Sequence, residues 1–188
     1  MPATPPSVAS VLGVANPATR LWKYQYGIPG VAGILELDPA ELVALNGDKL
    51  APWLCLTEDR RWSTHRVDVG AGTTKGSTYP RGELRQLNAD GSPAKWDTKS
   101  ARRWFDVEVV PTALPAGKPQ MCVMQLHDAK KDLFELIYQR NSAGGYEWTL
   151  RVDGSSTGQA KVPHSLGSKG VMAMEIVAGV LNIYRDGV

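Results

Sequence analysis

The sequence is poor in cysteine and has almost no excess of charge of either sign. Its two cysteines, Cys55 and Cys122, have no CxxC spacing, which excludes a disulfide framework and gives no sign of a zinc or redox site. Both lie in apolar, strand-like runs, so we interpret them as buried thiols, paired or free. The 21 basic and 19 acidic residues give a net charge of +2, so any anion site must be a local cluster.

Long apolar runs and common catalytic motifs are also missing. No run of about eighteen apolar residues could span a bilayer, and Met1–Ser7 lacks the pattern of a signal peptide. We therefore expect a protein that is cytosolic when made and then acts outside the cell after release, or is carried on a virion. There is no HExxH, Cys/His set, GxSxG or phosphate-binding glycine loop, so we predict no metal and no cofactor.

Helix signals occur once, and the rest of the chain has the pattern of strands. Asp38 as N-cap, Pro39, Glu41 as capping-box partner and Gly47 predict one short helix over 38–47. Short runs rich in Val, Trp, Ile and Tyr, separated by Gly and Pro, predict strands near 21–28, 53–57, 61–69, 78–87, 103–110, 120–127, 133–140, 146–152, 171–177 and 180–185. We expect a flexible arm over 1–20 and a single all-β domain, a β-sandwich or jelly roll, over 21–188.

Charge is concentrated in the stretch 77–87. Read as a strand, it places Tyr79, Arg81, Glu83 and Arg85 on one face. Arg81 and Arg85 are then ~13 Å apart with a carboxylate between them, an arrangement that suits a groove for a chain of anions. A solvated ladder of ion pairs is the alternative interpretation of the same pattern.

A second polar pair ends the apolar run 121–128. Period two places Gln125 and His127 on one face and Cys122, Met124 and Leu126 on the other, which has the composition of a core. An exposed strand end is the commoner explanation of such a pair taken alone. The other histidines, His65 and His164, have no chemical neighbour at a useful spacing.

Together the two stretches resemble motifs of the polysaccharide lyase family 7 alginate lyases. Arg81-Gly82-Glu83-Leu84-Arg85 resembles the family's Arg-Ser/Thr-Glu-Leu-Arg, and Gln125-Leu126-His127 resembles its Gln-Ile/Val-His. Gly82 and Leu126 depart from the pattern, but both alternate away from the polar face. The resemblance extends from about Trp22 to the C-terminus.

The resemblance implies a jelly-roll sandwich of two antiparallel sheets with a concave groove. It implies β-elimination on an acidic, uronate-containing polysaccharide, without nucleic acid or membrane as a partner. It assigns Arg81 and Gln125 to the substrate carboxylate and His127 to the base, with Tyr79, Glu83 and Arg85 binding neighbouring uronates. Residue types and roles agree, because guanidinium and amide donors bind carboxylates and an imidazole accepts a proton near neutrality.

The family's third motif, Tyr-Phe-Lys-Ala-Gly-x-Tyr-x-Gln, which supplies a catalytic tyrosine, has no match in this chain. The segment 181–188 is a strand that runs into Asp-Gly, a hairpin signal. We therefore expect the returning strand to lie beyond Val188 and the chain alone to lack a full active site. Tyr184, Tyr138 and Tyr79 match the missing acid by residue type only.

Two other functions fit parts of the sequence. A non-catalytic carbohydrate-binding jelly roll on a phage tail or surface assembly would explain the arm and the missing tyrosine motif. A purely structural tail or coat domain would explain the fold, but not the joint presence of Arg81, Glu83, Arg85, Gln125 and His127.

Overall fold

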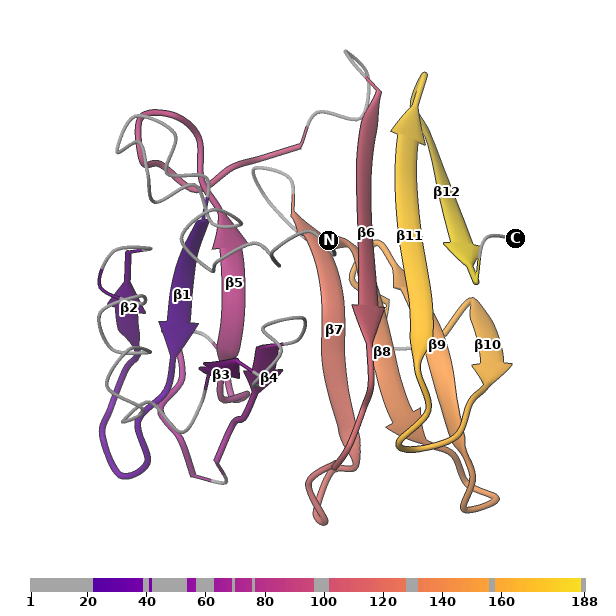
Figure 1. Ribbon diagram of the computed structural model, residues 1–188, viewed down its shortest axis with the longest axis horizontal. Helices are drawn as coiled ribbons and strands as arrows, with labels where there is room; N and C mark the ends of the chain where they lie inside the picture. The colour runs from indigo at the N-terminus through magenta and orange to yellow at the C-terminus, as the bar shows by residue number, and fades with distance from the viewer. Residues whose placement is uncertain are drawn as a thin grey trace, which may run out of the picture. The chain divides into compact units, whose positions relative to one another are not determined.

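The computed structural model describes residues 22–38, 41, 54–56, 63–68, 70–75, 77–96, 102–127, 132–155 and 158–186, and the strands among them pair in antiparallel sheets (Figure 1). The strands are β1 (Trp22–Tyr26), β2 (Leu35–Leu37), β3 (Leu54–Leu56), β4 (Ser63–His65), β5 (Gly82–Gln86), β6 (Arg103–Val109), β7 (Gln120–His127), β8 (Asp132–Arg140), β9 (Tyr146–Val152), β10 (Ala160–Pro163), β11 (Gly170–Val177) and β12 (Val180–Arg185). The chain divides into two compact units, Met1–Ala94 and Lys95–Val188, and the single domain predicted over 21–188 stays a prediction.

The first unit contains a three-stranded sheet in the order β2-β1-β5 and the two-stranded ribbon β3-β4. Alternation gives the three-stranded sheet one apolar face, on which Tyr24 lies between Leu37 and Leu84 in the strand register. Tyr24 and Tyr26 are both fully buried. Lys23, Gln25, Glu83 and Arg85 necessarily point to the opposite face.

The predicted helix start is confirmed at its capping box. The Asp38 amide donates to Glu41 Oε2 at 2.8 Å, and the Glu41 amide donates to Asp38 Oδ1 at 2.9 Å. This reciprocal pair satisfies two amide groups that a helix start otherwise leaves unpaired. The rest of the helix expected over 38–47, like the arm expected over 1–20, lies outside the described residues.

The predicted strand 78–87 begins later than expected. Its β-structure starts at Gly82, because the preceding residues form a turn in which the Tyr79 amide donates to Ser77 Oγ at 3.2 Å. Pro80 has no amide hydrogen to add to a ladder, which also favours a later start. Strand alternation therefore does not extend back to Tyr79.

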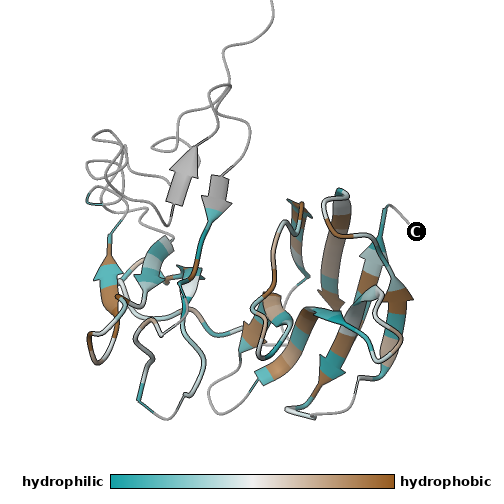
Figure 2. Ribbon diagram, turned by 90° about the horizontal axis from the view of Figure 1, so that it is seen from below, coloured by the Kyte–Doolittle hydropathy of each residue, from teal (hydrophilic) through white to brown (hydrophobic). Residues whose placement is uncertain are grey.

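The second unit is a sandwich of a four-stranded sheet, β10-β9-β8-β7, and a three-stranded sheet, β12-β11-β6. Hydrophobic and hydrophilic residues alternate along these strands (Figure 2). The inner faces of both sheets meet in one core, to which the first sheet contributes large aromatic and aliphatic side chains and β11 contributes Met172, Met174 and Ile176. The predicted strands from 103 onward are confirmed within a residue or two, whereas β2 and β10 were not predicted.

One hairpin shows how local geometry fixes the register of this unit. β11 and β12 are joined by Ala178 and Gly179, both with positive φ (50° and 80°), as a two-residue turn of the primed type requires. Glu175 on β11 is 8% exposed and accepts hydrogen bonds from Tyr184 and Asn182 on β12 and from Arg102. This carboxylate therefore binds three side chains on the outer face of the sheet.

The pKa of Glu175 is lowered, chiefly by the Tyr184 hydrogen bond and next by that of Arg102. A carboxyl whose pKa is lower in the folded state than in the unfolded state stabilises the fold. The stabilisation is complete at a pH above the unfolded-state pKa, and it is lost as the pH falls through the folded-state pKa. We expect Glu175→Gln to be destabilised most at neutral pH, with the difference from wild type shrinking in acid. Urea unfolding from about pH 7 to about pH 3 measures it.

Tyr184→Phe removes the largest cause of that shift and should show a smaller version of the same pH dependence. A difference between wild type and Glu175→Gln that stays constant into acid would contradict the assignment.

Candidate functional site

The first unit carries the charged face predicted from the stretch 77–87. Arg81 Nη1 donates to both oxygens of Glu83, at 2.9 and 3.1 Å, so Glu83 holds the guanidinium as the sequence suggested. The Arg81 side chain is 22% exposed, and its Nε has no hydrogen-bond partner among the described residues. An Arg donor that is buried and unpaired is typical of a group that awaits a ligand or ordered water.

Neighbouring strands extend this face with residues that sequence reasoning missed. In the strand register Gln25 lies opposite Glu83 on one side and Glu36 on the other, and Lys23 lies opposite Arg85. Lys23 Nζ donates to Glu36 Oε1 at 2.7 Å, and this bond, supported by the charge of Arg85, lowers the pKa of Glu36. The alternating Lys and Gln of the run 21–28 were the available signal.

Tyr79 has a different position from the one predicted. It lies in the turn before β5 and is 50% exposed. Its backbone, rather than a strand alternation, sets where it points. Strand alternation therefore does not place Tyr79 on the face of Arg81, as the sequence had predicted. The Tyr79 side chain is nevertheless accessible to a ligand.

In the second unit, Gln125 and His127 lie on the outer face of β7, as predicted. Asp132 Oδ1 lies 2.7 Å from His127 Nδ1, the separation of an ion pair once the imidazole is protonated. Gln125 lies opposite Glu135 in the register, and its Nε2 is 3.5 Å from Glu135 Oε1. Such a long contact leaves the amide able to bind something else. Asp132 was missed, since the expected strand began one residue later.

A β-bulge corrects the expected placement of Cys122. The register passes from Cys122 opposite Ile137 to Met124 opposite Leu136, so Val123 is an extra residue on β7. Cys122 therefore lies on the same face as Gln125, where it is exposed, and the prediction of a buried thiol is wrong for it. The side chain of Cys55 lies outside the described residues.

Polar residues of β8 and β9 continue this outer face. Glu147 is 7% exposed and accepts hydrogen bonds from Gln139 at 2.9 Å and Thr149 at 3.3 Å, and its pKa is lowered chiefly by the Gln139 bond. Arg151 lies opposite Glu135 and donates from Nη2 to Gln120 Oε1 at 3.3 Å. The polar alternation of Glu147, Thr149 and Arg151 was a sequence signal that was not used.

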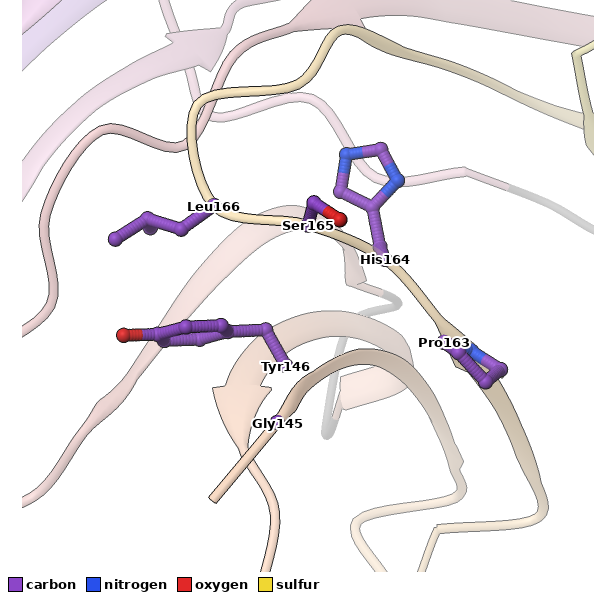
Figure 3. A pocket seen from close by; sticks show the side chains of 6 residues that line it. All are labelled: Gly145, Tyr146, Pro163, His164, Ser165 and Leu166. Carbon is purple, nitrogen blue, oxygen red and sulfur yellow. The ribbon is translucent and has the colours of Figure 1, made fainter.

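A shallow pocket in the second unit lies away from His127. Its lining residues are Gly145, Tyr146, Pro163, His164, Ser165 and Leu166 (Figure 3). Pro163 pairs with Glu147 at the end of the sheet opposite to His127. The His164 ring packs edge-on against the buried Tyr138, and its Nε2 is 3.0 Å from the Ser168 carbonyl oxygen. These contacts give His164 a packing role.

The two groups of predicted residues thus occupy one face in each unit. Arg81, Glu83 and Arg85 share a face in the first unit, and Gln125 and His127 share one in the second. In the part of the chain that the structure describes, no cluster of three His, Cys, Asp or Glu residues could hold a metal ion, and no helix is long and apolar enough to cross a membrane.

Solved structures of alginate lyases share this fold. The polysaccharide lyase family 7 alginate lyase AlgAT5 is 25% identical, with a TM-score of 0.75 over 89% of this chain and 73% of that chain. The alginate lyase from Corynebacterium sp. is 22% identical, with a TM-score of 0.74 over 96% and 76%. A family 7 alginate lyase variant solved in complex with the substrate GGMG is 22% identical, with a TM-score of 0.69 over 99% and 77%.

These likenesses confirm the predicted jelly-roll sandwich. No curated protein matches the chain. A family model described as alginate lyase matches residues 22–187, nearly the whole of the described structure and both predicted motifs. By that match the chain belongs to the alginate lyase family, and it is a polysaccharide lyase.

Proposed function

We propose that this lyase cleaves alginate by β-elimination, with Arg81 and Gln125 binding a uronate carboxylate and His127 taking the C5 proton. Membership of the alginate lyase family supports the substrate class. The contact of 2.7 Å between Asp132 Oδ1 and His127 Nδ1 is the observation that carries the assignment of the base.

The reaction needs a base, an electrostatic clamp and an acid. The base removes the proton at C5, and the electron pair forms an enolate with the adjacent carboxylate. The pair then forms the C4–C5 double bond as the C4–O4 bond breaks, and the leaving oxygen takes a proton. Donors around the carboxylate lower the barrier because negative charge grows there in the transition state.

His127 suits the base because its Nδ1 lies at ion-pair distance from Asp132 Oδ1, a buried carboxylate oxygen that makes no hydrogen bond in this geometry of the described residues. Asp132, on Nδ1, is the one polar partner that the described residues give the ring, which leaves Nε2 for the substrate proton. A carboxylate on the far nitrogen selects the tautomer and stabilises the imidazolium that forms. The residue-type argument thereby gains a geometric basis.

Arg81 and Gln125 suit the carboxylate. Glu83 occupies Arg81 Nη1, while the guanidinium keeps further donors for a ligand. Gln125 holds Glu135 only at 3.5 Å. Arg85, Glu83 and Tyr79 are assigned to neighbouring uronates on the same resemblance, and Lys23 joins them because it lies opposite Arg85.

The acid has three tyrosines as candidates by residue type, Tyr79, Tyr138 and Tyr184. Tyr138 is fully buried, and Tyr184 donates to Glu175 on the outer face of the other sheet of the second unit, so neither suits the role. Tyr79 is the exposed tyrosine of the three. Because Tyr79 lies in the turn before β5 and not on the strand face that carries Arg81's neighbours, we expect the chain to form the enolate faster than it completes elimination.

The proposed site of action is outside the cell, after release or on a virion, where a large polyuronate is accessible. A carbohydrate-binding module of a phage tail, without catalysis, is the competing function. Both functions predict alginate binding, so only a reaction at C5 separates them.

Deuterium exchange at C5 isolates the step assigned to His127, because it needs the base and the clamp but no acid. In D2O we expect the wild-type chain to exchange this proton in alginate oligomers, as followed by mass spectrometry. His127→Ala should slow exchange about 10²-fold or more and keep most of the affinity for alginate. Arg81→Ala should lose affinity as well. Binding without exchange in the wild type would favour the phage-tail module.

Asp132→Asn tests the carboxylate behind the base. Since Asn keeps the shape but not the charge, we expect C5 exchange to slow and its pH profile to change, with alginate affinity unaltered. Asp153→Asn, in the exposed turn after β9 with a φ of 61°, is the matched control and should behave as wild type. An Asp132→Asn profile that superimposes on wild type would remove Asp132 from the mechanism.

A further inference from the structure

The outer face of the sheet β12-β11-β6 carries an exposed indole ring and a half-buried phenol ring that the proposed mechanism does not use. Trp104, the second residue of β6, is 48% exposed and shares its face of the strand with Asp106 and Glu108. Tyr184 on β12 lies beside it, with ring centroids 5.5 Å apart and planes tilted by 34°. In the register, Ala173 lies between Asp106 and Tyr184. A small residue there leaves the two rings standing above the sheet.

Hydrogen bonds hold these rings in place. The Trp104 indole N–H donates to Asp106 Oδ1 at 2.9 Å, and the Tyr184 hydroxyl donates to Glu175 Oε2 at 2.9 Å. Both acceptors belong to the same face of the sheet. Rings whose orientation is already set lose little conformational entropy when a ligand packs on them.

A cation borders the same face. The Arg102 guanidinium lies 5.9 Å from the Trp104 ring centroid and is 68% exposed, while its Nε donates to Glu175. Glu108, on the same face of β6, is 3.6 Å from Lys169 Nζ. Asp106 is therefore the carboxylate of this face that has no cation beside it among the described residues, and it keeps one oxygen for a hydroxyl donor.

We propose that this face, the platform formed by Trp104, Tyr184, Arg102 and Asp106, binds a stretch of alginate away from the proposed catalytic residues. The proposal rests on alginate being the substrate. The C–H face of a pyranose ring packs on the indole, because the ring face is negative and C–H bonds are positive. Arg102 then pairs with a uronate carboxylate and Asp106 accepts from a sugar hydroxyl.

The platform and His127 lie on opposite sides of the second unit. His127 is on the outer face of the four-stranded sheet, the platform is on the outer face of the three-stranded sheet, and the core lies between them. One stretch of an alginate chain can therefore be bound at the platform while another stretch of the same chain, or of a neighbouring chain in a gel, reacts at His127. A second contact raises the affinity for the polymer by increasing effective concentration, without any effect on short oligomers.

The test compares polymer with trisaccharide. Electrophoresis through gels containing alginate measures retention by the polymer, and C5 exchange on a uronate trisaccharide measures the proposed catalytic residues alone. We expect Trp104→Ala to weaken retention about three- to tenfold and to leave trisaccharide exchange unchanged. Val180→Ala removes another exposed apolar side chain from the same outer face and should change neither measurement.

Two further variants keep the test decisive if Trp104→Ala does not fold. Trp104→Phe keeps a ring and should retain most of the polymer affinity, whereas Arg102→Gln should weaken retention most at low salt. If Trp104→Ala is retained as strongly as Val180→Ala, the platform proposal is overturned. Trisaccharide exchange by the wild type would in that case still uphold the proposed function. Parallel loss of retention and trisaccharide exchange also overturns it. A wild type that is not retained by alginate and does not exchange fails on both proposals.

Discussion

The packing of two inner sheet faces in the second unit is the constraint on which its chemistry depends. Phe134, Tyr138 and Trp148 from one sheet pack with Met174 and Ile176 from the other, all at 3% exposure or less. Because side chains alternate along a strand, burying these residues forces their neighbours to the two outer faces. Gln125 and His127 project from one outer face, and Trp104 and Tyr184 from the other.

Departures from strict alternation carry information about the site. A single extra residue on β7, Val123, moves Cys122 to the polar face while Met124 and Leu126 remain in the core. A second irregularity between Leu126 and His127 brings His127 opposite Asp132. Bulges of this kind re-aim side chains beside functional sites, and here the result is a carboxylate at 2.7 Å from the proposed base.

Carboxylates in both units position cationic or polar side chains. Glu83 holds Arg81, Glu36 holds Lys23, Asp132 faces His127 and Glu175 holds Tyr184. Where the carboxylate accepts a hydrogen bond, as Glu83, Glu36 and Glu175 do, it fixes the orientation of the group that it binds. Preorganisation of this kind is what a clamp for a uronate carboxylate and a platform for a sugar ring both require.

The sequence by itself determined the all-β class, most strand positions, the Asp38–Glu41 capping box and the grouping of Arg81 with Glu83 and of Gln125 with His127. Each of these features depends on the two-residue alternation of a strand or on contacts between residues a few positions apart. Both can be read from a short stretch of sequence. Only the tertiary structure decided the late start of β5 at Gly82, the exposure of Cys122, and the partners Glu36, Asp132 and Arg102. Bulges, turns and strand pairing bring those residues together, and pairing between strands is set by burial of the whole face rather than by any one stretch.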